Sequence, residues 1–282
     1  MESWFPLALL AGLTSAANVY ASKLLVTGRL NPILVGGWVH VLGGLICLPG
    51  LPLIRLELPS SPLLWLGVLG MGAIYVLGNL WYFSALAQTP LSEIDFYLRT
   101  SSLWTFLGGL IILSEPLGWG AVVGAGLILA SVFSLSQQNQ LGKFSRAQLL
   151  ALGAALAFGA GNLVDKALSP HFDALSYTLL NQLLTGLGML AVARAFLPQL
   201  RAAQLWGWGA WLVALTFALT QTLLVLAYQA DGAAGQVILV AQARLLLLVG
   251  IGVLVLGERE RLSRKLIAAL LMLAGIFTLY QT

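Results

Sequence analysis

Hydrophobic stretches of about 20 residues follow one another along the chain, separated by very short polar connections. A helix needs about 20 mostly apolar residues to cross the hydrocarbon core of a bilayer. Open strands would leave unsatisfied backbone groups in lipid, so such stretches form helices. The sequence therefore predicts ten membrane-spanning helices, near residues 4–22, 31–53, 62–86, 92–113, 117–136, 148–167, 174–196, 205–228, 234–256 and 265–281.

Charged residues are too scarce for a water-soluble fold of this length. Of the 282 residues, 59% are hydrophobic and 9% are charged, whereas soluble domains carry roughly 25% charged residues. Lipid must therefore cover most of the surface, and we expect an all-α integral membrane protein. No connection is long enough for a nucleotide-binding domain, and no GxxxxGK[ST] loop is present, which excludes an ATP-driven pump.

The second half of the chain repeats the first. A shift equal to the separation of Glu115 and Glu258, 143 residues, aligns five spans with five spans without a gap. Other pairs in this register are Lys23 with Lys166, Gly43 with Gly186, and Gly109 with Gly252. We expect five-helix repeats at 1–139 and 144–282. An odd number of spans makes the second repeat enter from the opposite side, which predicts the inverted repeat common in secondary transporters.

Two segments share a more specific pattern. "LSEPLGWGAVVGAGLILASVFSLS" (113–136) and "LGERERLSRKLIAALLMLAGIFTLY" (256–280) each contain an acid-bearing turn and a glycine-bearing final helix. With "YFSALAQTPLSE" (82–93) before span four, the chain resembles EamA-type members of the drug/metabolite transporter superfamily over essentially its whole length. The resemblance implies a ten-helix transporter; known members include amino-acid exporters and nucleotide-sugar and triose-phosphate translocators. Ser114 replaces the usual turn glycine and Pro116 follows the glutamate, a departure expected to alter only a loop.

Positive residues predict the orientation, because they bias short loops toward the cytoplasm. The loops after spans one, five, seven and nine contain Lys23, Arg29, Lys143, Arg146, Arg194, Arg201, Arg259, Arg261, Arg264 and Lys265. The alternate loops hold only Arg55 and Lys166. The net charge of +4 is thus an orientation signal, and no nucleic-acid partner is expected. Both termini are predicted outside a bacterial inner membrane, although the resembling family is usually drawn with both termini in the cytoplasm.

Two arginines, Arg99 and Arg244, fall inside predicted spans. An arginine facing lipid costs at least a few kcal/mol, so we expect both to line the bundle interior, with snorkelling at the interface as the alternative. Asp95 lies four residues before Arg99, a spacing that lets the two pair on one helix face. Because the halves are inverted, this pair and Arg244 should lie at opposite mouths of a central cavity.

These charges suggest two gates that close alternately. The gate and coupling residues are Lys23, Glu93, Asp95, Arg99 and Lys166. Either acid, Glu93 or Asp95, is a candidate to carry a coupling proton when it is desolvated.

Polar and aromatic side chains recur at helical spacing between the two mouths. The predicted substrate-binding residues are Asn18, Trp38, Tyr75, Asn79, Tyr82, Asn162, Gln221, Tyr228, Gln236 and Arg244. Each could instead bridge two helices, but together they predict a polar cavity near the middle of the membrane.

A secondary transporter working by alternating access is the leading functional interpretation, and export is the expected direction. The acids offset the arginines, which favours an amino acid or another zwitterion; a phosphorylated or anionic metabolite, or a passive facilitator, is the alternative. An enzyme is not expected, because His40 and His171 lie in different regions without an HExxH or acid-rich metal motif. The lone Cys47 excludes a cysteine metal cluster, and we expect no cofactor, no metal and no catalytic residue. A monomer is expected, with a dimer as the alternative.

Overall fold

The computed structural model describes residues 3–26, 30–53, 56, 58–88, 94, 97–116, 118–134, 145–247 and 262–281. Within these ranges all regular secondary structure is helical. Six helical segments are long and apolar enough to cross a membrane, and three shorter apolar helices accompany them. The predicted class, an all-α membrane protein, is confirmed.

Each α-helix of the described ranges lies in a different predicted span. The first half contains α1 (Trp4–Val26), α2 (Pro32–Cys47), α3 (Pro62–Gln88), α5 (Thr100–Ile111) and α6 (Trp119–Ser134). The second contains α7 (Arg146–Leu168), α8 (Ala174–Val192), α9 (Trp208–Gln229), α10 (Ala234–Ala241) and α12 (Leu262–Tyr280). Short 3-10 helices are η1 (Leu48–Leu53), η2 (Ser169–His171), η3 (Arg194–Arg201) and η4 (Ala203–Leu205). Shifted by the 143-residue register, α1, α2, α3 and α6 overlap α7, α8, α9 and α12.

Local sequence explains where several helices begin. The Asn31 side chain accepts the backbone N–H groups of Ile33 and Leu34, and Pro32 occupies the first turn of α2, where its missing N–H is not needed. Ser145 and Gln148 form a reciprocal capping box at the start of α7. These caps satisfy backbone donors that would otherwise be unpaired where each chain segment enters the bundle.

The two halves run in opposite directions across the bundle. At the end of α1, Leu25 accepts a hydrogen bond from Gln204, which precedes α9, at 2.9 Å. At the end of α7, Lys166 donates to the carbonyl of Tyr228, at the far end of α9, at 2.9 Å. The 22 residues of α9 separate these sites by about 33 Å at 1.5 Å per residue. The equivalent helices α1 and α7 therefore end at opposite faces, as an inverted repeat requires.

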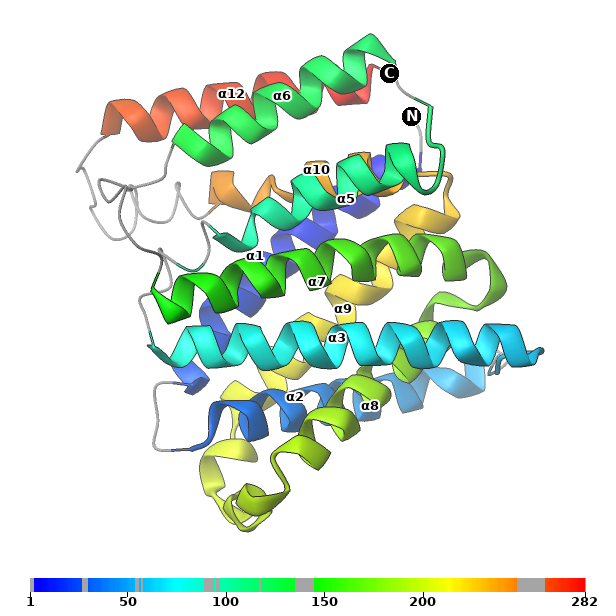
Figure 1. The fold of residues 1–282 in the computed structure, drawn as a ribbon, viewed down its shortest axis with the longest axis vertical. Coiled ribbons are helices and arrows are strands. Elements are labelled where there is room, and N and C mark those ends of the chain that lie inside the picture. The colour runs from blue at the N-terminus through cyan, green and yellow to red at the C-terminus, as the bar shows by residue number, and fades with distance from the viewer. Residues whose placement is uncertain are drawn as a thin grey trace.

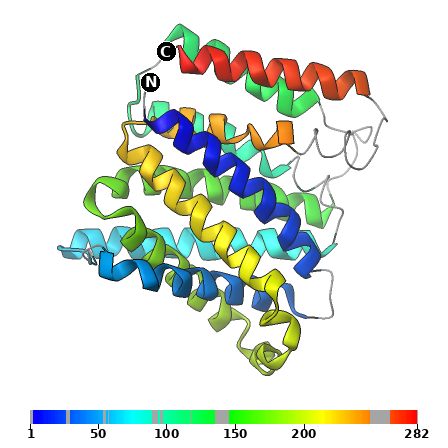
Figure 2. The same cartoon turned by 180° about the vertical axis from the view of Figure 1, so that it is seen from behind.

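Helix contacts follow the same symmetry. In Figures 1 and 2, α3 lies beside α7, α1 beside α9, α2 beside α8, α5 beside α10, and α6 beside α12. Exchanging the halves converts the α3–α7 contact into the α9–α1 contact and leaves the other three pairs unchanged. Both chain termini lie at one end of the bundle (Figure 1), which we call the Glu115 end; the opposite end, with the start of α2, is the Asn31 end.

Large apolar side chains on the outside of the bundle indicate a lipid-facing surface. Leu63 is 76% exposed and Ile111 is 78% exposed, positions that water would disfavour but hydrocarbon accepts. Trp119 and Trp208, the first residues of α6 and α9, are 85% and 78% exposed. Tryptophans at helix ends are typical of the interfacial belt of membrane proteins.

Glycine lets α6 and α12 approach closely. A Cβ built on Gly124 would lie 3.0 Å from the carbonyl oxygen of Gly275, and one on Gly275 would lie 2.8 Å from that of Gly124. Small residues at such crossings are the usual device for helix association in lipid.

Candidate functional site

Two of the predicted spans are interrupted near their middle. Residues 234–256 were expected to form one helix, but α10 ends at Ala241, Gln242 and Ala243 form a turn, and helix resumes at Arg244. The amides of Gln242 and Ala243 bond three residues back, to Leu239 and Val240, as in a 3-10 turn. The amides of Leu245 and Leu246 likewise bond three residues back, to Gln242 and Ala243, so the amides of this turn are paired. A membrane tolerates such irregular backbone only where it faces protein or a water-lined cavity.

The other interruption occupies the equivalent position in the first half. Arg99 forms a turn between helical Leu98 and Thr100, and its carbonyl accepts from the amide and the hydroxyl of Ser102. In the 143-residue register, Arg99 pairs with Gln242. Discontinuous helices in matching positions of two inverted halves are characteristic of transport sites.

A polar cavity of about 180 Å³ lies beside the second break. It is lined by Ala11, Ser15, Ser101, Phe158, Asn162, Thr220, Leu224, Ile238, Ala241, Gln242 and Arg244. Ser101 and Arg244 are register partners, as are Ser15 and Phe158, so the cavity lies where the two halves meet. Its volume is below the roughly 300–1,000 Å³ of pockets for drug-sized ligands, which suits a small metabolite.

Among the polar side chains of the lining, Arg244 and Gln242 offer a charge and an unsatisfied acceptor. A terminal nitrogen of Arg244, Nη1, donates to Ser15 Oγ at 3.0 Å. Gln242 is 5% exposed, and its side-chain oxygen Oε1 is buried without a hydrogen-bond partner among the described residues. The lining thus offers a guanidinium to an anion and an unsatisfied carbonyl oxygen to a donor such as an ammonium group.

An acid that sequence analysis missed lies one turn beyond the cavity on α7. Asp165 is fully buried and accepts three hydrogen bonds: from Tyr75 at 2.5 Å, Tyr177 at 2.6 Å and Gln221 at 2.8 Å. Tyr75 and Gln221 had been predicted to bind substrate; here both hold this carboxylate. The available signal was an aspartate three residues after Asn162 inside an apolar run.

A second buried polar cluster connects to the first. His40 on α2 bonds Gln182 on α8 at 2.5 Å and Asn79 on α3 at 3.2 Å. The amide nitrogen of Asn79 donates to the Tyr75 carbonyl at 2.9 Å. Asn79, predicted to contact substrate, therefore bonds within the first half, to α2 and to its own helix, and His40 joins this group to α8 of the second half.

Of the other predicted binding residues, Asn162 and Arg244 line the cavity. Asn162 also donates to Thr105 on α5 at 3.0 Å. Tyr82 is 6.2 Å from Phe158, one of the lining residues, measured between ring centroids. Their roles in binding remain predictions.

The remaining predicted binding residues lie elsewhere. Asn18 joins α1 to α9 through the Val213 carbonyl and Thr216, the helix-bridging alternative. Trp38 donates to the carbonyl of Leu205 at 2.9 Å, at the Asn31 end of the bundle. Gln236 and Tyr228 belong to α10 and α9 and do not line the cavity.

The predicted gate is only partly described. Glu93, Asp95 and the side chain of Lys23 lie outside the described residues. Arg99 is 7% exposed, so its side chain lies inside the protein, and its role at a gate stays a prediction. Lys166 lies at the Glu115 end, where its ammonium group bonds the Tyr228 carbonyl.

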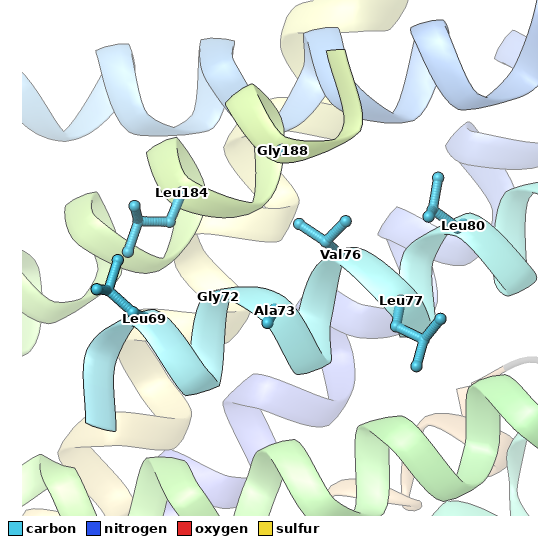
Figure 3. A pocket seen from close by; sticks show the side chains of 8 residues that line it. All are labelled: Leu69, Gly72, Ala73, Val76, Leu77, Leu80, Leu184 and Gly188. Atoms are coloured by element: carbon cyan, nitrogen blue, oxygen red, sulfur yellow. The ribbon is translucent and has the colours of Figure 1, made fainter. Parts of the chain in front are cut away.

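A larger hollow, about 430 Å³, lies between α3 and α8. Figure 3 shows its lining side chains, Leu69, Val76, Leu77, Leu80 and Leu184, with Gly72, Ala73 and Gly188. Every one is apolar, so this groove offers nothing to orient a polar metabolite, and the smaller cavity is the better candidate site.

Comparisons with known proteins agree with this architecture. A model of the EamA-like transporter family matches residues 2–137 and again residues 145–281. Twenty-three solved chains are similar; one crystal structure has a TM-score of 0.70 and 18% identity, covering 97% of this chain and 98% of that chain. At that identity the likeness shows the fold alone. No curated protein matches the chain.

Proposed function

This chain belongs to the EamA-like transporter family, and from that premise we propose that it is a secondary transporter of small zwitterionic metabolites, with amino acids favoured. It works by alternating access: the two inverted halves rock about the cavity and expose it to one side and then the other. Membership of the family makes the chain a membrane transporter; the substrate and the mechanism are the proposal.

The cavity beside the second break carries the substrate assignment. Arg244 would bind the carboxylate, since a guanidinium matches two carboxylate oxygens with two parallel hydrogen bonds. The unsatisfied oxygen of Gln242 would accept a hydrogen bond from the ammonium group, and the face of Phe158 adds attraction for a cation. Both residues line the same cavity, so one small molecule could contact both.

A phosphorylated or other anionic metabolite is the second candidate. It is favoured by the charges of the lining, which among the described residues includes the cation Arg244 and no carboxylate. The small cavity volume and the unsatisfied Gln242 acceptor count against it, because the oxygens of a fully ionised phosphate cannot donate to a carbonyl.

The test is a thermal-shift screen of the purified protein against amino acids, organic anions and phosphorylated metabolites. A ligand that binds only the folded state raises the melting temperature by mass action, about 2.7 kcal/mol of stabilisation at a hundred times its Kd. Stabilisation by an amino acid but not by its decarboxylated amine or deaminated acid supports the zwitterion. Stabilisation by phosphorylated compounds alone supports the second candidate.

Transport of the hit is then measured by exchange in reconstituted vesicles. If no compound that binds is exchanged by the wild type, the transporter assignment for this cavity fails. The proposal further places the protein in a bacterial inner membrane, with the Asn31 end in the cytoplasm, as the loop charges predict.

A further inference from the structure

The Asp165 cluster links the two halves of the bundle. Tyr75 belongs to α3 of the first half, whereas Asp165, Tyr177 and Gln221 belong to α7, α8 and α9 of the second. The Tyr75–Asp165 hydrogen bond therefore crosses the boundary along which the halves would move in alternating access.

No cation among the described residues pairs with this carboxylate. The titratable groups that interact with it electrostatically are the phenols of Tyr75 on α3, Tyr177 on α8 and Tyr228 on α9. Its neighbour Lys166 instead interacts with Glu115 and Asp231. Acids inside membrane spans are expensive to bury without a counter-ion, and where they occur they usually serve ion or proton pathways.

The inverted repeat supplies an internal comparison. The register partners of Asp165, Tyr75, Tyr177 and Gln221 are Ser22, Ala218, Leu34 and Gly78, and all four are buried. In the first half, Ser22 thus stands in place of the acid, and apolar residues stand in place of the three donors. Because the fold does not need a carboxylate at this place, the one in the second half calls for a functional explanation.

Tyr228 suggests a route to the acid. Its side chain is 2% exposed, and its hydroxyl has no hydrogen-bond partner among the described residues. It interacts electrostatically both with Asp165 and with Glu115, which lies in the turn at the Glu115 end. A phenol hydroxyl can both donate and accept a hydrogen bond, as a proton relay requires.

We propose that Asp165 is a proton-binding site that couples proton movement to the motion of the two halves. The ionised carboxylate accepts all three donors and holds Tyr75 of the first half against the second. A proton arriving from the Glu115 end bonds to one carboxylate oxygen, which then becomes a donor and can no longer accept from Tyr75 in the same way. The hydrogen bond between Tyr75 and Asp165 weakens, and the two halves can then move relative to each other. Loss of the proton restores the hydrogen bond. This coupling rests on the proposed transport function.

Proton binding can be tested without a substrate. Infrared difference spectra of the purified protein, recorded as pH is lowered, should contain the carbonyl band of a newly protonated carboxylic acid. Asp165→Asn should lose that band. Asp173→Asn, the matched control, should retain it, because Asp173 caps α8 at its start and asparagine caps equally well. Identical spectra for the wild type and Asp165→Asn would overturn the proposal.

Tyr75→Phe tests the link between the halves and covers the case in which Asp165→Asn does not fold. Removing one donor to the carboxylate should shift the pH at which the band appears. An unshifted band in Tyr75→Phe would show that this contact does not respond to protonation and would likewise overturn the proposal.

Transport separates this proposal from the one on which it rests. Substrate exchange by the wild type should depend on pH, and that dependence should disappear in Asp165→Asn but persist in Asp173→Asn. If substrate exchange by Asp165→Asn still depends on pH, the proposed coupling is overturned, but the proposed transport function stands. Absence of exchange by the wild type, with the infrared band present, counts against the transport function and against coupling, but leaves the proton site itself.

Discussion

Glu115 connects the last turn of the first half to a helix of the second. One carboxylate oxygen accepts the amide of Ala234, the first residue of α10, at 2.6 Å, and the other lies 3.5 Å from the amide of Gly235. The acid thus caps a helix more than a hundred residues away, with its negative charge at the positive end of the helix dipole. Its removal should destabilise the packing of the halves.

The size of the effect follows from these two contacts. The shorter is a charge-assisted hydrogen bond, with a net worth of about 1.5–3 kcal/mol, and the longer lies at the limit of a hydrogen bond and adds little. Loss of a helix cap costs about 0.5–2 kcal/mol. Because both figures describe the same interaction, we expect Glu115→Ala to lower the free energy of unfolding by about 2 kcal/mol. Glu115→Gln keeps a neutral acceptor and should cost roughly half as much.

Gly109 provides a second, coupled test. A Cβ at this position would collide with a Glu115 carboxylate oxygen, so Gly109→Ala should destabilise the wild type by about 1–3 kcal/mol. In the Glu115→Ala background the collision is absent, and the same change should be neutral or slightly stabilising, since alanine is the better helix former.

The assay is unfolding of the purified protein in mixed micelles titrated with a denaturing detergent, for the wild type, both single variants and the double variant. Equal midpoints for the wild type and Glu115→Ala would refute the capping role. Additive effects of Gly109→Ala and Glu115→Ala would refute the contact between them.

Other predictions concern the turn, the site, the gate and the orientation. Ser114 has a φ of 53°, a left-handed conformation that favours glycine, so Ser114→Gly should raise the unfolding free energy by about 0.4–1 kcal/mol in the same titration. Arg244→Lys should weaken exchange clearly, and Arg244→Ala should abolish it; normal exchange by both variants would remove Arg244 from the binding site. Asp95→Asn should remove the predicted charge partner of Arg99 and increase labelling of a cysteine at the same mouth, and adding Arg99→Gln should partly reverse this. Equal labelling rates would exclude a gating pair. A cysteine in place of Glu260 should resist impermeant reagents added outside intact cells, and strong labelling there would reverse the predicted orientation.

The helical class and the number of spans follow from hydrophobicity alone. In lipid each backbone group must be satisfied within its own segment, so a run of about 20 apolar residues has one available structure. The repeat could also be found from the sequence alone. Duplication leaves a constant spacing between equivalent residues, and this spacing is visible without knowing which helices are in contact. The turn pattern around Glu115 was recognisable in the sequence, but the role of Glu115 was not. The amides that Glu115 caps belong to the second half of the chain.

The breaks at Arg99 and Gln242 were not predicted. Neither is a glycine or a proline, the residues that usually mark an interruption in a helix. At both positions φ and ψ stay in the right-handed helical region while the hydrogen bonds tighten to the 3-10 pattern. Such a local change cannot be read from a run of apolar residues. The cavity residues Ser15 and Ser101 were missed for the same reason, since small hydroxyl residues are common in spans that merely pack.

Composition and periodicity by themselves determined that this chain crosses a membrane as two inverted sets of helices, because those properties depend only on local hydrophobicity and on the repeat. The tertiary structure decided which polar groups meet. Tyr75, Tyr177 and Gln221 converge on Asp165 from three helices, while Asn18 bridges α1 and α9. Helical spacing places a side chain on a face, but the neighbour of that face is set by packing between helices distant in sequence. The hydrogen-bond partners of a buried polar group, and with them its chemistry, are therefore properties of the folded bundle.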